Sequence, residues 1–338
     1  MKILTLLVAF SFLIFSNAVR ADPASDLLKI INRPKVPLNP EVEQLPHADD
    51  VLKYHFTYAT QEGTRVPGLI YKLAGDQRRP VVIVAHGTEE SKDMYVDLLS
   101  MLAKRGFIAV AIDGRYFGER ISYGKTTFEY CDKIAAAYYG SGEHPLYYDT
   151  VWDDLRLLDY LENRPDVDAS RIGMTGVSKG GIETYMTTAI DPRIKVAAPL
   201  IAMQGFKWEL DNNLWMRRVN SFQKAFDKVV KQEGINNPTS AFVAKFYDRV
   251  VPGIYGEFDG PALIKLIAPR PLFISNGGRD GLTPKPSVEL CIAIAKETYA
   301  KDHASDRFEY QFEDTDKHLV SPKTFSKVVD WFARWLKP

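Results

Sequence analysis

The feature that most constrains this chain is a strand, a tight turn and a helix that follow one another around Ser178. An apolar run over residues 172–175 leads into Gly176-Val-Ser-Lys-Gly180, and a helix-prone segment follows over residues 181–190. In this context a G-x-S-x-G pattern is typical of a serine held on a sharp, strained turn that lifts its hydroxyl off the sheet edge. The pattern predicts that Ser178 is a nucleophile; a chance match in an ordinary turn is the alternative.

Apolar runs alternate with helical patterns on both sides of this turn. Continuous apolar runs are expected of strands that are covered on both faces of a parallel sheet. Besides the Ser178 strand, they occur at 80–85 and 107–113, and further strand–helix units follow at 196–201, 271–276 and 308–312. An alternating pattern at 52–59 and 66–73 predicts a hairpin, and an amphipathic helix over 323–336 closes the chain. These patterns predict an α/β fold with a mainly parallel sheet flanked by helices.

Two long segments interrupt the alternation. Residues 119–149 follow the second parallel strand, and residues 204–266 form a mostly helical insertion, a cap, after the sixth strand. Their many aromatic residues argue against disorder and favour lids with small cores of their own. Phe206 and Trp208 follow a sheet strand so closely that we expect them to line a substrate pocket.

The first residues are predicted to lie outside the fold. Lys2, the apolar run 3–15, and Val19 and Ala21 before Asp22 match a secretory signal peptide, with an uncleaved anchor as the alternative. This pattern predicts a signal peptide over 1–21, a secreted or periplasmic protein and no stable membrane anchor. Residues 22–50, rich in proline and charge, are predicted to be an extended arm with one short helix, which leaves 51–338 as the α/β domain.

Charge and cysteine content exclude several functions. Lys plus Arg and Asp plus Glu both count 43, so nothing suggests a nucleic-acid partner. Cys131 and Cys291 could form a disulfide or be two small buried side chains. Cysteine and histidine show no metal-ligand spacing, so we expect no metal and no cofactor.

A serine hydroxyl needs a base within hydrogen-bond reach, and that base needs a carboxylate to orient it. His318 follows the last strand in a short polar loop, at the sheet edge where Ser178 also lies, and is the predicted base. Asp280 follows the strand at 271–276 through a Gly-Gly turn and is the predicted carboxylate. Asp314 and Asp316 are the alternatives, although we expect them to face solvent.

An ester carbonyl also needs two backbone donors for its developing oxyanion, each worth about 3 kcal/mol in the transition state. The N–H of Lys179, after the nucleophile, and the N–H of Thr88, after the first parallel strand, are the candidates. His86 is expected to hold that second turn. The Lys179 side chain is expected to be solvent-exposed, with contact to a substrate anion as the alternative.

Charged residues cluster after two further elements. Asp113, Arg115, Glu119 and Arg120 follow a buried strand and predict an ion-pair network that holds loops, or alternatively an anion site. Asp153 and Asp154 are expected in the first turn of a helix that begins near Thr150.

From residue 51 onward the chain resembles the α/β-hydrolase superfamily, in the branch of dienelactone hydrolases, acetyl xylan esterases and prolyl-oligopeptidase-like enzymes. The resemblance rests on Val84-Ala-His-Gly-Thr88, Asp113-Gly-Arg-Tyr-Phe-Gly-Glu-Arg120, the Ser178 turn, Ala268-Pro-Arg-Pro-Leu272 with Asp280, and His318. The order Ser, Asp, His along the chain is that of the superfamily. Dienelactone hydrolases carry a cysteine at the position of Ser178, so their activity is not implied, and the chain has no propeller domain.

The sequence therefore predicts a secreted serine hydrolase that cleaves carboxylic esters through an acyl-enzyme. A peptidase or amidase with the same three residues, and a catalytically silent relative that binds a ligand, are the alternatives. A small-molecule or carbohydrate ester is the expected substrate, by analogy with this branch. The acyl chain length and the oligomeric state are left open.

Overall fold

A computed structural model describes residues 23–47, 50–125 and 127–338, so the predicted signal peptide lies outside the described residues. Over that part of the chain, a nine-stranded sheet has the order β1-β2-β3-β5-β4-β6-β7-β8-β9. The strands are β1 (Glu41–Leu45), β2 (Val51–Gln61), β3 (Thr64–Leu73), β4 (Arg79–Ala85), β5 (Ile108–Ile112), β6 (Val167–Val177), β7 (Ile194–Leu200), β8 (Leu272–Gly277) and β9 (Phe308–Glu313). The neighbours from β5 through β9 pair in parallel and the remaining neighbours pair antiparallel, which confirms the mainly parallel sheet.

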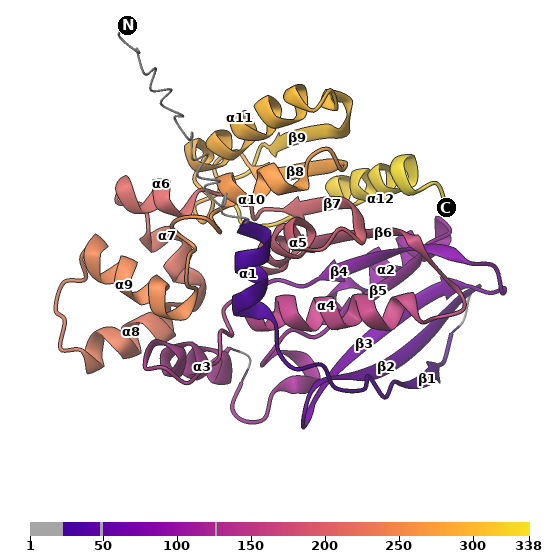
Figure 1. Cartoon of the computed structure of the whole chain (residues 1–338), viewed down its shortest axis with the longest axis horizontal. Coiled ribbons are helices and arrows are strands. Elements are labelled where there is room, and N and C mark those ends of the chain that lie inside the picture. The colour runs from indigo at the N-terminus through magenta and orange to yellow at the C-terminus, as the bar shows by residue number, and fades with distance from the viewer. Residues whose placement is uncertain (1–22, 48–49, 126) are drawn as a thin grey trace, which may run out of the picture.

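Helices cover both faces of this sheet (Figure 1). They are α1 (Pro23–Ile31), α2 (Val96–Lys104), α3 (Phe128–Tyr138), α4 (Tyr148–Glu162), α5 (Lys179–Ile190), α6 (Phe206–Asp211), α7 (Met216–Val219), α8 (Gln223–Gln232), α9 (Ser240–Val250), α10 (Gly260–Ile267), α11 (Lys285–Lys301) and α12 (Pro322–Leu336). One core lies under α1, α4, α5, α10 and α11, and a second lies under α2 and α12. No helix in the described part has the length and apolar character needed to span a membrane.

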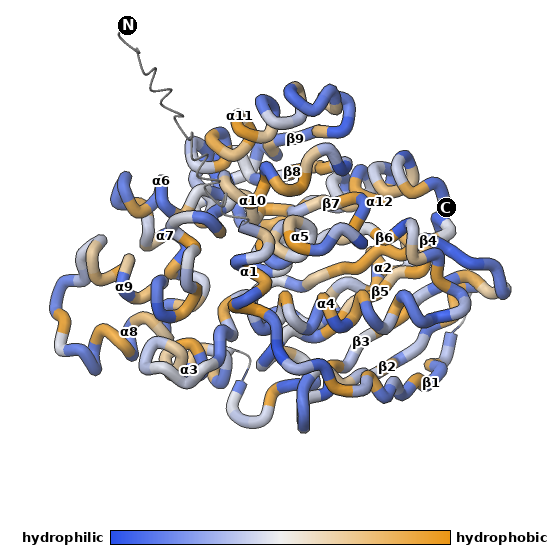
Figure 2. The backbone as a smooth tube through the Cα atoms, viewed as in Figure 1, coloured by the Kyte–Doolittle hydropathy of each residue, from blue (hydrophilic) through white to orange (hydrophobic). Residues whose placement is uncertain are grey.

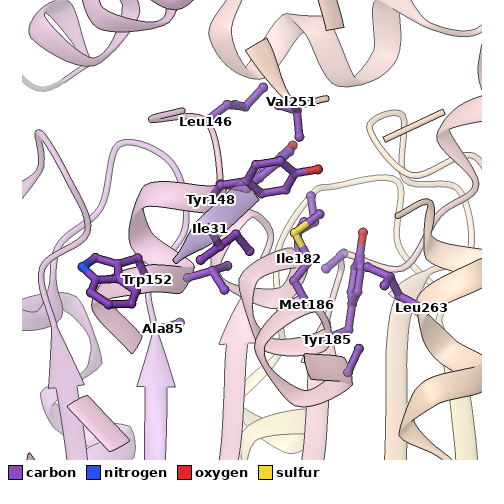
Figure 3. Close-up of a cluster of buried hydrophobic side chains, with 14 of the residues drawn as sticks. Ile31, Ala85, Leu146, Tyr148, Trp152, Ile182, Tyr185, Met186, Val251 and Leu263 are labelled. Carbon is purple, nitrogen blue, oxygen red and sulfur yellow. The ribbon is translucent and has the colours of Figure 1, made fainter. Parts of the chain in front are cut away.

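The inner parallel strands β4 and β5 carry the predicted continuous apolar runs because both of their faces are covered, whereas β9, at the sheet edge, alternates and is only partly buried. β4 and β5 are buried along their whole length, and Figure 2 shows the hydrophobic central strands between more polar helices. Between the sheet and the helices, Tyr148 and Trp152 from α4 lie in one cluster with Ile31, Ile182 and Met186 (Figure 3). Cys131 and Cys291 are both free and buried, so they form no disulfide with each other and are two small buried side chains.

The N-terminal arm is more ordered than predicted. Its short helix is present as α1, which packs against α4 and α5. Residues 41–45, however, form an edge strand in which Glu41 pairs with Thr57 of β2. That strand is almost entirely exposed, so it has no buried face and no hydrophobic alternation by which the sequence could reveal it. Because of this extra strand, the cap follows the seventh strand rather than the sixth.

The two interruptions of the alternation fold together. α3, from the first interruption, packs against α8 and α9 from the second, and Figure 1 shows the three at one end of the sheet. Tyr138 of α3 stacks on Phe246 of α9 with ring centroids 5.7 Å apart. α10 does not belong to this layer, because it packs against α5 and α11 beside the sheet. The cap therefore ends before the predicted residue 266. It also includes α3, which comes from the first interruption.

Replacing Trp152 by alanine is expected to lower the free energy of unfolding by about 3–5 kcal/mol. Trp152 is 1% exposed, and its indole N–H donates to the Thr60 carbonyl oxygen at 3.1 Å, so the change leaves both a cavity and an unpaired acceptor. Urea unfolding measures the loss. Val42→Ala, at a half-exposed position of β1, is the control and should change stability by less than about 0.5 kcal/mol. Equal effects of the two substitutions would contradict this prediction.

Candidate active site

Ser178 occupies the turn between β6 and α5. Its backbone is strained, with φ 53° and ψ −113°, and its N–H donates to the Leu200 carbonyl oxygen at 2.9 Å. The flanking glycines are required by space, because a Cβ on Gly176 would lie 2.3 Å from the Gly180 carbonyl oxygen. A Cβ on Gly180 would lie 2.3 Å from the carbonyl oxygen of Ala85 in β4. The turn therefore brings Ser178 against the end of the neighbouring strand, at the carboxyl edge of the sheet.

The structure brings Ser178, His318 and Asp280 together from three separate loops. His318 Nε2 lies 2.7 Å from Ser178 Oγ, and His318 Nδ1 lies 2.6 Å from Asp280 Oδ2. His318 follows β9 and Asp280 follows β8, as their predicted places at the sheet edge require. A single hydrogen-bonded chain thus runs from the hydroxyl through the imidazole to the carboxylate.

Asp280 is held as an oriented anion. Its side chain is fully buried, and it accepts hydrogen bonds from the Leu282 N–H and the Thr283 hydroxyl, both at 2.8 Å. Burial opposes ionisation, but the hydrogen bonds and charge of His318, together with these two donors, outweigh burial and lower the pKa of Asp280. Asp314 and Asp316 are both exposed, and Asp314 pairs with Arg279 at 2.5 Å.

The turn after β4 faces Ser178, as expected for one side of an oxyanion site. His86 is buried; its Nδ1–H donates to the Gly87 carbonyl oxygen at 2.7 Å, and its Nε2 accepts the Gly114 N–H at 2.8 Å. Burial, and then the charge of Lys179, lower the pKa of His86 to about 4, so the imidazole stays neutral and keeps this tautomer. His86 therefore holds the turn, as the sequence predicts.

Lys179 is buried rather than solvent-exposed, which corrects the prediction for its side chain. Its Nζ lies 2.5 Å from Glu183 one turn further along α5, and 5.4 Å from the centre of the Phe117 ring. Every residue of α5 is buried between the sheet and neighbouring helices, so a cation at its first position must find its partner inside the protein. Burial, opposed by Lys179, raises the pKa of Glu183 to about 7.

Replacing Lys179 by methionine is expected to lower stability more at pH 9 than at pH 5. Without the cation the pKa of Glu183 rises further above about 7, whereas in the unfolded chain it returns to its ordinary value of 4.5. The folded protein then holds a proton that the unfolded chain has lost, so the free energy of unfolding falls as the pH rises through this range. We expect a loss of about 3 kcal/mol at pH 9, measured by urea unfolding.

The double variant Lys179→Met/Glu183→Gln is the matched control for this effect. It carries no ionisable group at either position, so the extra loss between pH 5 and pH 9 should disappear. Identical pH dependence of the single and the double variant would rule out Glu183 as its source.

The charged cluster after β5 forms the predicted ion-pair network, but through partners that were not predicted. Lys92 Nζ lies 2.9 Å from Asp113 and 2.5 Å from Glu119, while Arg115 and Arg120 lie 3.1 Å and 2.8 Å from Asp153. Asp153 and its neighbour Asp154 are buried in the second turn of α4 and not in its first turn, because the helix begins at Tyr148. The network fastens the loops after β5 to α4.

A cavity of about 250 Å³, here called the Ser178 cavity, opens at the hydroxyl. Its lining includes Gly87, Thr88, Glu89 and Glu90 of the turn after β4, Asn220 and Ser221 of the cap, and Val177, Ser178, Ile201, Leu282 and His318. In the described part of the chain, no group of three or more His, Cys, Asp and Glu side chains could hold a metal ion.

Phe206 and Trp208 do not line the Ser178 cavity, contrary to the prediction. Phe206 is buried and packs edge-on against Tyr147 and Tyr247, with ring centroids 6.4 Å and 6.0 Å apart. Trp208 instead lines a separate surface pocket with Tyr255. β7 ends at Leu200 and both residues lie in α6, which begins at Phe206, so they follow the strand by a five-residue connection.

Glu90 was missed by sequence reasoning. Its Oε2 accepts the Gly87 N–H at 2.7 Å and the Tyr95 hydroxyl at 2.6 Å, so this carboxylate shapes the turn that faces Ser178. The sequence shows only that a glutamate stands three residues after Gly87, and a glutamate on the protein surface could stand there equally well. Asn220 and Ser221 were also missed, because their place depends on how the cap folds back.

Comparisons with known proteins agree with this architecture. The family model described as acetyl xylan esterase (AXE1) matches residues 28–241. The Bacillus subtilis protein YtaP, to which a hydrolase activity is attributed, is 27% identical over 55% of this chain and 53% of its own length. The 4-O-methyl-glucuronoyl methylesterase of Hypocrea jecorina is 27% identical over 54% of this chain and 39% of its own length. This chain thus aligns with only about half of YtaP and less of the methylesterase.

The structure of acetyl xylan esterase 1 from a Thermoanaerobacterium species superposes with a TM-score of 0.69 over 93% of this chain and 92% of that one. At 18% sequence identity, it shows the α/β-hydrolase fold alone. The family match covers Ser178 and the turn after β4, and it ends before Asp280 and His318. The chain belongs to the acetyl xylan esterase (AXE1) family of α/β-hydrolases.

Proposed function

We propose that this protein is a serine esterase that hydrolyses short-chain carboxylic esters through an acyl-enzyme. The observation that carries the proposal is the hydrogen-bonded chain from Ser178 through His318 to Asp280, which opens onto a cavity. Hydroxyl, imidazole and buried carboxylate in this order form the arrangement that converts a weak nucleophile into an effective one.

In the first half of the reaction, Ser178 Oγ attacks the ester carbonyl carbon while His318 Nε2 takes the hydroxyl proton. Asp280 keeps Nδ1 protonated and stabilises the imidazolium that forms. The imidazolium then gives its proton to the leaving alcohol oxygen as the carbon–oxygen bond breaks. Water attacks the acyl-enzyme by the same route and releases the acid.

The oxyanion of each tetrahedral intermediate is assigned to two backbone donors, the N–H groups of Lys179 and Thr88. Lys179 begins α5, and the first N–H groups of a helix have no acceptor within it and carry a partial positive charge. Thr88 lines the Ser178 cavity, in the turn that His86 and Glu90 hold. Donors fixed in advance cost no reorganisation when the charge develops.

The size of the Ser178 cavity supports a small acyl group. About 250 Å³ lies below the range of roughly 300–1,000 Å³ that is usual for drug-sized ligands. Membership of the AXE1 family and the acetyl xylan esterase structure favour acetyl esters of carbohydrates as the natural class.

The test is hydrolysis of 4-nitrophenyl esters from acetate to decanoate, with acetylated xylo-oligosaccharides and a 4-nitroanilide in parallel. We expect turnover that is highest for acetate and falls steeply beyond butyrate, labelling of Ser178 by a fluorophosphonate probe, and release of acetate from the oligosaccharides. Ester turnover that persists in Ser178→Ala at close to the wild-type rate would overturn Ser178 as the nucleophile. Cleavage of the anilide without cleavage of the esters would identify an amidase.

We also propose that the protein is exported, on the strength of the signal-peptide pattern in residues 1–21. N-terminal sequencing of protein recovered from outside the cytoplasm should then begin at Asp22. Recovery of an intact Met1 terminus would contradict this proposal.

A further inference from the structure

We infer that a cleft between α2 and α12 binds the leaving alcohol of the substrate and selects an uncharged alcohol with an apolar body. This inference rests on the proposed esterase function and adds where the two halves of the ester lie. The cleft, here called the α2–α12 cleft, has a volume of about 540 Å³. It is separate from the Ser178 cavity, but Glu90, Val177 and His318 line both.

The position of His318 assigns the cleft to the alcohol half. Its Nε2 must return a proton to the leaving alcohol oxygen, so the alcohol has to lie on the imidazole side of the tetrahedral carbon. The α2–α12 cleft is on that side, because its wall continues from His318 into Leu319 and Val320. The Ser178 cavity, in contrast, contains the turn with Thr88, where the carbonyl oxygen is assigned.

The chemistry of the wall defines the kind of alcohol. Its apolar side chains are Met94, Leu98, Met101, Leu319, Val320 and Phe325. Met94 and Leu319 are 65% and 43% exposed. Exposed apolar side chains that gather along one cleft mark a surface that binds a ligand or another partner. Two methionines give such a surface the ability to adapt to different ring-shaped groups.

The charges along the cleft select against an anion. Glu90 and Asp97 contribute carboxylates, and the described residues that line the cleft include no lysine or arginine. Glu90 lies at the junction of cleft and cavity, where the Gly87 N–H and the Tyr95 hydroxyl hold it in place. An alcohol that carries a carboxylate would meet this acidic wall without a cation to pair with.

The two volumes together determine which half of the ester is small and which is large. A cavity of about 250 Å³ takes the acyl half and a cleft of about 540 Å³ takes the alcohol half. The chain is thus suited to a small acyl group on a bulky alcohol, and not to the methyl ester of a bulky sugar acid.

Acyl transfer to added alcohols tests the cleft independently of the acylation step. Acetyl-enzyme formed from 4-nitrophenyl acetate is partitioned between water and methanol, benzyl alcohol or 4-(hydroxymethyl)benzoate. In each transfer the alcohol oxygen bonds to the acetyl carbon and its proton passes to His318. The bond from that carbon to Ser178 Oγ breaks, and Oγ takes the proton back from His318. The yields of ester and acetate give the partition ratio for each alcohol.

For the wild type we expect benzyl alcohol to capture the acetyl group about fivefold better than methanol or the anionic alcohol. Met94→Glu places a charge on the apolar wall outside the proposed catalytic groups, and it should lower benzyl capture about fivefold while methanol capture stays unchanged. Phe325→Ala should act in the same direction. Val42→Glu, a matched change on the distant β1 strand, should have no effect.

Each other result overturns the inference. Equal capture of methanol and benzyl alcohol by an enzyme with Ser178-dependent turnover removes the alcohol site and leaves the esterase proposal intact. A Met94→Glu effect that follows the acyl chain instead of the alcohol assigns the cleft to the acyl half. A change in oligomeric state with unchanged partition assigns it to a second copy of the chain. Absence of any Ser178-dependent turnover overturns both proposals.

Discussion

Replacing Ser178 by alanine is expected to lower kcat by about 10⁶-fold towards short-chain esters. The change removes only the hydroxyl that His318 Nε2 contacts at 2.7 Å, and with it the covalent route. The rate that remains should still exceed the rate in water by about 10³–10⁴-fold, because the backbone donors and the substrate cavity stay in place.

The fold should tolerate this substitution. Ser178 keeps the strained turn through its backbone N–H bond to Leu200, and the glycines that permit the turn are unchanged. The melting temperature of Ser178→Ala should therefore match that of the wild type within a few degrees, while the fluorophosphonate probe no longer labels the protein. Substantial activity in a folded, unlabelled variant would place the nucleophile elsewhere.

Replacing Asp280 by asparagine is expected to lower kcat by about 10⁴-fold. All the groups around this carboxylate are donors: the Leu282 N–H to Oδ1, and the Thr283 hydroxyl and the His318 Nδ1–H to Oδ2. An asparagine has one oxygen and one NH₂ group, so it cannot accept from both sides. If its NH₂ faces His318, Nδ1 must lose its proton and Nε2 carries the proton, so the ring can no longer accept the Ser178 proton.

Asp314→Asn is the matched control for this substitution. Asp314 lies in the same loop as His318 but is 90% exposed and pairs with Arg279. Its replacement should leave kcat unchanged, and both variants should unfold at denaturant concentrations close to that of the wild type. Comparable losses of activity in the two variants would mean that the carboxylate partner of His318 was assigned wrongly.

The parallel part of the sheet could be predicted because strands that are buried on both faces have unbroken apolar runs in the sequence. β4 and β5 are buried throughout and read as unbroken apolar runs, whereas β1 is almost entirely exposed and carries no such pattern. The same logic explains the location of Ser178, Asp280 and His318, since each follows a recognisable strand at one sheet edge.

What could not be predicted depends on contacts between distant segments. The burial of Lys179 is decided by the helices that enclose α5, and its partner Glu183 looks like any helix-surface acid in the sequence. Phe206 and Trp208 were placed by their nearness to a strand, but Phe206 packs against Tyr147 and Tyr247, and Trp208 lines a pocket apart from Ser178. Asn220 and Ser221 line the Ser178 cavity because the cap folds back over it. No local sequence pattern predicts this arrangement.

The cap has a consequence for how a chain of this kind can change. α3 lies in one interruption and α8 and α9 lie in another, yet each buries its apolar face against the other segment, as Tyr138 does on Phe246. Exchanging residues 204–259 alone with a homologous gene would leave α3 without its counterpart. The cap therefore cannot be exchanged as a single segment. Its two parts have to change together in evolution, because a substitution in one limits the side chains that the other can accommodate.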